Sequence, residues 1–395
     1  MGALLLALIY VCFISLGLPD SLLGSAWPVM HAEISVPVSF AGIISTVISL
    51  GTIISSLFCD RLNKKFGSGL VTAVSTAMTA VSLFGFSISN QFWMLILWAI
   101  PYGLGAGGVD AILNNYVALH YKPQHMSWLH CFWGVGASIS PYIMSFALVG
   151  LQDWSAGYLI VSIIQIVLTA VIFISIPLWK KVANCKKTTE DETEVKPESE
   201  QKPLFLKEIF QIPGAIYCFI LFFCYCALES SASLWASTYL VDVHGVEAEV
   251  ASAFASLFYI GVTVGRGVNG FLAMRFSDRT LIRTGLGIIT VGVCLLLLPL
   301  PSIMAFIGFV VIGLGCAPVY PCIIHMTPDV FGKERSQAMI GVQMAAAYTG
   351  YLLLPPLVGV IADLFGIFLL PVCLVILLVS MIFMHETLYK KTKTI

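Results

Sequence analysis

Residues 180–207 read KKVANCKKTTEDETEVKPESEQKPLFLK and form the only long polar run in a chain of 395 residues. Their mixed charge, few apolar side chains and two prolines cannot bury enough apolar surface to fold, so we expect a solvated linker. Apolar sequence of similar length lies on both sides of this run. The run therefore predicts an N-terminal bundle over residues 1–179, a linker over 180–207 and a C-terminal bundle over 208–395.

Each flank of the linker resolves into six apolar segments of about 20 residues, the length that a helix needs to cross a hydrocarbon core of about 30 Å. We expect helices because a backbone surrounded by lipid must satisfy its own hydrogen bonds. The prediction is an all-α integral membrane protein with twelve transmembrane helices in two six-helix halves. The predicted helices cover residues 3–30, 37–58, 69–89, 92–119, 127–150, 157–179, 212–240, 250–273, 282–300, 302–326, 336–362 and 366–385.

The composition excludes several classes of function. Hydrophobic residues make up 58% of the chain, charged residues 10%, and the mean hydropathy is +0.95, which is not expected of a soluble protein. No basic run outside the linker indicates a nucleic-acid partner. The eleven cysteines form no C-x-x-C pair, so we expect neither a metal site nor disulfides. The stretch GLGAGG at 103–108 matches a dinucleotide fingerprint but lies inside a predicted span, so we expect no cofactor and no enzyme.

Lysine and arginine fall on alternate connections between the predicted helices, which by the positive-inside rule places both termini and the linker in the cytoplasm. We therefore expect a multi-pass plasma-membrane protein. The short tails and the absence of an N-x-[S/T] site favour a bacterial inner membrane. The basic residues are Arg61, Lys64, Lys65, Lys122, the linker lysines, Arg275, Arg279, Arg283, Lys333, Arg335, Lys390, Lys391 and Lys393.

The two flanks share sequence marks at matching places. Gly103-Leu-Gly105 in the fourth predicted helix has a counterpart in Gly313-Leu-Gly315 of the tenth. Pro141 of the fifth has its counterpart in Pro355 and Pro356 of the eleventh. Repeats of the same orientation suggest an axis along the membrane normal. Such a protein is expected to have its site between the halves.

The stretch SLFCDRLNKK at 56–65 resembles the signature loop of the major facilitator superfamily, G-x-x-x-D-R-x-G-R-R. Ser56 and Asn63 replace its two glycines. A degenerate second copy, GFLAMRFSDR, lies at 270–279. The resemblance implies a connection between the second and third helices that acts as a conformational gate, formed by Asp60, Arg61, Lys64 and Lys65.

Three further stretches resemble the fucose-permease branch of sugar–proton symporters. They are LPD at 18–20, GGVDAILNN at 107–115 and ESSASLWASTY at 229–239. The resemblance implies that Asp20 and Asp110 serve proton coupling and sugar binding. Because the fourth helix has Asp where the fucose permease has Glu, the resemblance does not imply the same substrate.

An ionised carboxylate at mid-membrane depth costs several kcal/mol, so an acid there is expected to be functional. We predict that Asp110 binds the substrate through hydroxyls shared with Asn114, and that Asp20 carries the proton. The alternative is that both acids are structural and hydrogen-bonded within their own half. Glu229 is a third candidate for proton coupling, and it and Arg266 are expected to be partners, either as a structural tie or in substrate binding.

Aromatic rings are expected to stack on the apolar face of a sugar, while amides and carboxylates bind its hydroxyls. The substrate-binding candidates are Asp110, Asn114, Asn115, Trp133, Trp235, Arg266, Asn269, Tyr320, Gln343 and Tyr348.

Together these features predict a monomeric transporter in the lipid bilayer that moves a sugar or related polyol with protons by alternating access. Sequence does not distinguish H⁺ from Na⁺ as the coupling ion. One alternative is a proton-coupled exporter of drugs or organic ions, although the fifth helix, WGVGASISP at 133–141, lacks the Gly-Pro-rich motif usual there. Another is a transporter-like sensor that binds a ligand without moving it.

Overall fold

The computed structural model describes residues 2–37, 40–187, 204–246 and 248–392. Within these ranges every regular element is helical. Eleven of the described helices are long and apolar enough to cross a membrane, and α10 (Ala248–Leu272) occupies the place of the predicted eighth span. The predicted all-α membrane fold is confirmed.

By its internal contacts the chain divides into two compact units. The first unit contains residues 1–120 and 132–204, and the second contains residues 121–131 and 205–395. The beginning of α6 (Pro123–Phe146) thus belongs to the second unit and its remainder to the first. The division into two six-helix bundles that meet at the linker stays a prediction.

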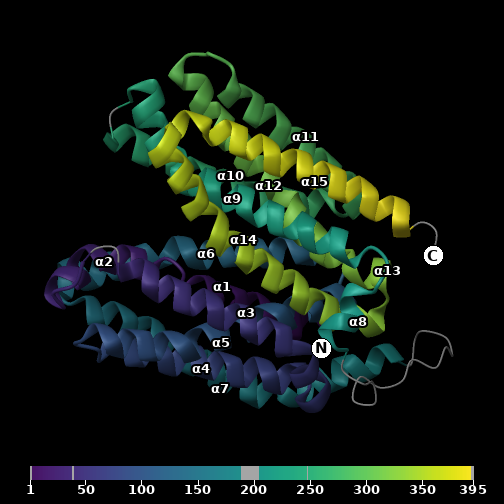
Figure 1. The fold of residues 1–395 in the computed structure, drawn as a ribbon. Helices are drawn as coiled ribbons and strands as arrows, with labels where there is room; N and C mark the ends of the chain where they lie inside the picture. The colour runs from purple at the N-terminus through teal and green to yellow at the C-terminus, as the bar shows by residue number, and fades with distance from the viewer. Residues whose placement is uncertain (1, 38–39, 188–203, 247, 393–395) are drawn as a thin grey trace. The chain divides into compact units, whose positions relative to one another are not determined.

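The main helix contacts of the first unit involve α3, α4, α5 and α7. In Figure 1, α3 and α4 lie alongside α5, and α4 also packs against α7. A π-helical turn, Ala147–Leu151, continues α6. The other helices of this unit are α1 (Gly2–Gly17), α2 (Leu22–Glu33), α3 (Phe40–Phe66), α4 (Ser68–Ser87), α5 (Phe92–His120) and α7 (Trp154–Lys187).

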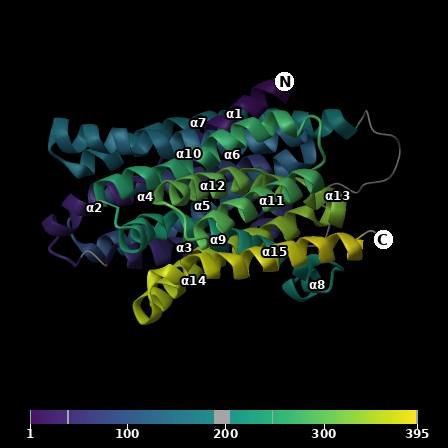
Figure 2. The same ribbon diagram turned by 90° about the horizontal axis from the view of Figure 1, so that it is seen from above.

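In the second unit, α9 packs against α14 and α15, and α12 packs against α10 and α11 (Figure 2). Two short 3₁₀ segments, Lys333–Arg335 and Ile367–Leu369, precede α14 and α15. Besides α10, the helices of this unit are α8 (Leu206–Phe210), α9 (Ala215–His244), α11 (Asp278–Leu297), α12 (Ser302–His325), α13 (Thr327–Phe331), α14 (Ser336–Phe365) and α15 (Leu370–Thr392).

The first predicted helix, over residues 3–30, is interrupted. A turn at residues 18–21 separates α1 from α2. Pro19 has no amide hydrogen and cannot donate to the carbonyl of Ser15, and the side-chain amide of Gln165 donates to that carbonyl instead, at 2.8 Å. The prediction of one continuous helix is therefore wrong at this point, and Asp20 lies in the turn.

Two predicted boundaries also change. The stretch at 56–65, expected to be a connection, forms the last turns of α3, and only Gly67, with φ +79°, separates α3 from α4. An ion pair of Lys64 with Asp60 at 3.0 Å, four residues apart, supports these turns. At the linker, α7 extends to Lys187 and α8 begins at Leu206. Residues 188–203 lie outside the described part of the chain.

Two glycines bring α1 and α6 into backbone contact. A Cβ atom at Gly136 would collide with the carbonyl oxygen of Ile14, and one at Gly17 would collide with that of Trp133. Without side chains at these points the two backbones meet. This contact places Trp133 next to the end of α1.

We predict that Gly136→Ala lowers the free energy of unfolding of the detergent-solubilised protein by about 1–3 kcal/mol, the usual cost of overpacking. The control is Gly287→Ala in α11, where a Cβ atom meets nothing within 4 Å. That change should be neutral or stabilise by up to about 1 kcal/mol, since alanine is the better helix former. Equal thermal stability of the two variants would contradict the close α1–α6 contact.

Candidate transport site

Asp20 is an accessible acid held by an aromatic side chain. The indole Nε1 of Trp133 donates to its Oδ2 at 2.8 Å, and the Asp20 side chain is exposed. The hydroxyl of Ser21 donates to the carbonyl of Ala137 at 2.6 Å, which fixes the turn to α6. The break in the first helix therefore presents a carboxylate beside an indole ring.

Asp110 lies in α5 and is 4% exposed. The side-chain amide of Asn114 donates to Asp110 Oδ1 at 2.8 Å and to the backbone carbonyl of Asp110 at 3.0 Å. Asn115, the next residue in the sequence, is also buried. Asp110 is close enough to Asp20 for their charges to interact. The structure thus places the two acids in the same unit, one of them exposed and the other buried.

The glycines on the Asp110 face of α5 serve helix packing. A Cβ atom at Gly103 would collide with the carbonyl of Ile48, and one at Gly107 would lie 2.5 Å from the carbonyl of Thr52. Both partners lie in α3. The close approach expected at this face is therefore made by a helix backbone.

Glu229 and Arg266 form a buried ion pair in the second unit, with Arg266 Nη2 at 3.3 Å from Glu229 Oε1. The hydroxyl of Tyr351 donates to Glu229 Oε2 at 2.7 Å, and the ring of Tyr320 lies 5.9 Å from the Arg266 guanidinium carbon. The predicted partnership of the two charges is present. Sequence reasoning missed Tyr351, whose only signal was its spacing of three residues from Tyr348 on one helix.

Several residues predicted to bind the substrate contact other residues of the second unit. The indole of Trp235 donates to the carbonyl of Pro355 at 2.9 Å, and the amide of Gln343 donates to Thr327 Oγ1 at 2.9 Å. Asn269 is 2% exposed, and the ring of Tyr348 lies 6.5 Å from that of Tyr351. These contacts are compatible with a packing role, and the substrate-binding role of each residue stays a prediction.

The four proposed gate residues lie in the last two turns of α3. Asp60 is 4% exposed and pairs with Lys64, and its Oδ2 also accepts a hydrogen bond from the backbone amide of Leu204 at 3.3 Å. The guanidinium of Arg61 lies 5.6 Å from the ring of Phe58, and the ammonium of Lys65 lies 5.1 Å from that of Phe66. Asp60 is therefore held by Lys64 of its own helix and by Leu204 near the end of the linker.

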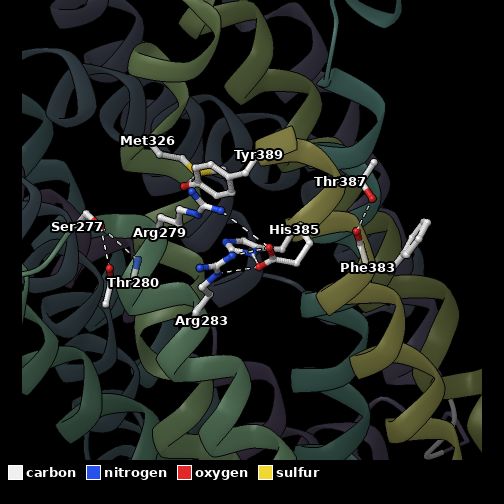
Figure 3. Close-up of polar contacts among 10 residues, drawn as sticks. Ser277, Arg279, Thr280, Arg283, Met326, Phe383, His385, Thr387 and Tyr389 are labelled. Carbon is white, nitrogen blue, oxygen red and sulfur yellow. Dashed lines mark hydrogen bonds and ion pairs between the residues drawn. The ribbon is translucent and has the colours of Figure 1, made fainter. Parts of the chain in front are cut away.

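Arg279, the last residue of the second signature copy, joins a charged cluster between α11 and α15 (Figure 3). Arg283 Nε donates to Glu386 Oε1 at 2.8 Å, and Arg279 lies 3.9 Å from the same carboxylate. The Arg279 guanidinium carbon lies 4.4 Å from the centre of the Tyr389 ring. Asp278, the acid of this copy, pairs with His325 at the end of α12 at 2.6 Å. These pairs tie three helix ends together.

We predict that Glu229→Ala lowers the free energy of unfolding by about 3–5 kcal/mol, because it leaves the buried Arg266 charge without its ion-pair partner. Adding Arg266→Met should recover most of this loss, since a lone buried charge costs more than an apolar side chain of similar size. Thermal unfolding in detergent measures both variants.

The matched control is Glu386→Gln, which removes the charge of a carboxylate that is 36% exposed and that pairs with Arg283, itself 49% exposed, and with Arg279. It should cost no more than about 1 kcal/mol. A double variant as unstable as Glu229→Ala alone would show that the ion pair is not the source of the loss.

Comparison with known proteins agrees with this architecture. The protein called Bypass of stop codon protein 6 of Saccharomyces cerevisiae is 24% identical over 410 residues, covering 96% of this chain and 81% of that protein. The glucose/mannose transporter GlcP of Bacillus subtilis is 20% identical over 336 residues, covering 82% and 80%. A crystal structure of the E. coli fucose:proton symporter FucP superposes with a TM-score of 0.74 at 15% identity, covering 96% of this chain and 98% of that one.

At these identities the likeness to the solved structure concerns the fold alone. The family assignment comes from the sequence profile of the Major Facilitator Superfamily, which matches residues 9–263 and 245–394 and so spans most of the chain. With the all-helical fold and its apolar spans, this match identifies the protein as a membrane transporter. The chain belongs to the Major Facilitator Superfamily.

Proposed function

We propose that this transporter moves a sugar or related polyol together with protons, as a symporter that works by alternating access. The observation that carries the proposal is the pairing of Asp20 with Trp133 at the break in the first helix. A carboxylate accepts hydrogen bonds from hydroxyl groups, and an indole ring offers a flat apolar face for a pyranose. The names of the similar glucose/mannose transporter and fucose:proton symporter support the same substrate class.

In this proposal Asp20 carries the proton. Its side chain is exposed, so the carboxylate is not sealed between packed helices. An ionised carboxylate is costly at membrane depth, whereas its protonated form is much less so. Protonation of Asp20 therefore removes a charge that opposes movement of the loaded site between the two sides of the membrane.

Asp110 and Asn114 complete the proposed site in the first unit. The hydrogen bond from Asn114 orients the Asp110 carboxylate, as a group that fixes substrate hydroxyls must be oriented. Because Asp110 is 4% exposed, this role requires a state of the transport cycle in which α5 is more accessible.

In the second unit, the proposed contribution is the cluster of Glu229, Arg266 and Tyr351. An ion pair surrounded by tyrosines supplies both donors and acceptors for a polyol. The unbroken pair in the structure equally fits a structural tie. A variant that folds without the pair separates the two roles, because only the substrate-binding role requires that it lose transport.

The alternatives differ in what they predict for flux. An exporter of organic ions or drugs would move its substrate against a proton flow of opposite direction. A sensor would bind a ligand and show no flux at all. Neither is favoured by a specific contact in the described part of the chain.

We predict that adding the right sugar to a lightly buffered suspension of cells or vesicles containing the protein raises the external pH, because protons enter with the substrate. A panel of hexoses, pentoses, hexuronates and polyols should be added one at a time, with a protonophore present in a parallel sample to abolish the signal. Vesicles with Asp20→Asn protein serve as the matched control. Acidification of the medium on addition of a substrate would indicate that protons move in the opposite direction to the substrate. Labelled sugar that binds to the protein without entering the vesicles would indicate a sensor.

A further inference from the structure

A small cavity lies within the first unit at the C-terminal end of α1. It has a volume of about 10 Å³ and is lined by residues of α1, α4, α5 and α7 together with Pro19 of the turn. This is about the minimum space that holds one water-sized occupant. The cavity therefore has room for a single small species and not for a sugar.

The walls of this cavity supply oxygen atoms. Ser15 is 3% exposed, and its hydroxyl has no hydrogen-bond partner among the described residues. Gln165 and Thr79 also line the cavity, and the Thr79 hydroxyl donates to Gln165 Oε1 at 2.7 Å. A hydroxyl that donates one hydrogen bond keeps its oxygen lone pairs available. An occupant of the cavity would give the Ser15 hydroxyl a partner.

The electrostatic setting favours a positive occupant. The C-terminus of a helix carries about half a negative charge, and α1 ends at Gly17, next to Leu16 and Pro19 of the cavity wall. Asp20 directly follows Pro19 and is close enough to Tyr102, another lining residue, for electrostatic interaction. Among the described residues that line the cavity, none is Lys, Arg or His.

We propose that this cavity binds a sodium ion. Hard cations prefer oxygen ligands such as hydroxyls, amide oxygens and backbone carbonyls, and interrupted membrane helices present such carbonyls to coupling ions. The Pro19 break places the negative end of the α1 dipole at the cavity, and Ser15, Thr79 and Gln165 supply side-chain oxygens. The Ser15 carbonyl already accepts a hydrogen bond from Gln165 and is not counted among the ligands. The role of the ion in coupling rests on the proposed transport function, whereas its binding can be measured without any substrate.

Thermal unfolding of the purified full chain in detergent tests the proposal. The melting temperature should rise with NaCl and saturate, while KCl and choline chloride at equal ionic strength should have little effect, because a ligand that binds only the folded state stabilises it. Ser15→Ala should raise the half-saturating NaCl concentration about tenfold or more. Without sodium this variant should be at least as stable as the natural chain, since it removes an unpaired buried hydroxyl.

The matched control is Ser140→Ala in α6. Ser140 is also fully buried with an unpaired hydroxyl, but it does not line the cavity. It should keep the sodium response of the natural chain. Equal responses to NaCl, KCl and choline chloride, or an unchanged response in Ser15→Ala, would overturn the proposal. A sodium response with no sugar-dependent pH change would instead leave the site standing and count against proton symport.

Discussion

A polar group inside an apolar span must find its partner within the chain, because lipid offers none. This constraint explains two buried sets of polar contacts, one in each unit. Pro19 deprives the Ser15 carbonyl of its helical donor, and Gln165, 150 residues away in sequence, supplies a donor instead. In the second unit the same requirement joins Arg266 to Glu229 and Glu229 to Tyr351. Each partnership also determines what the region can do chemically.

The break at Pro19 has consequences for function because it removes Asp20 from a regular helix. Inside a continuous α-helix, Asp20 would have shared its face with neighbours one turn away. In the turn it is instead exposed and within reach of Trp133, which the contact at Gly17 and Gly136 brings close to α1. The position of Asp20 thus depends on one missing amide hydrogen and on the Gln165 side chain, and that of the Trp133 ring on the two glycines.

Hydropathy and charge were sufficient to predict the helices, their order and the intramembrane charges, since these depend on local composition. The pairing of Glu229 with Arg266 could be predicted because each lies deep in an apolar helix and needs a partner. The break at residues 18–21 could not, because a proline does not by itself break a membrane helix. Pro101 and Pro141 both lie inside continuous helices. The outcome depended on a distant side chain that satisfies the freed carbonyl. Tyr351 was missed for a similar reason, since its role follows from the position of Glu229 on another helix.

The central proposal is that Asp20 couples substrate movement to the proton gradient, and replacing it with a group that does not titrate tests this most directly. Once a substrate is known, Asp20→Asn vesicles should be assayed both for exchange of labelled sugar at equilibrium and for accumulation against a gradient. The account predicts that exchange persists and accumulation is lost, because the neutral amide still accepts hydrogen bonds but cannot gain or release a proton. Accumulation at the rate and level of the natural protein would contradict it.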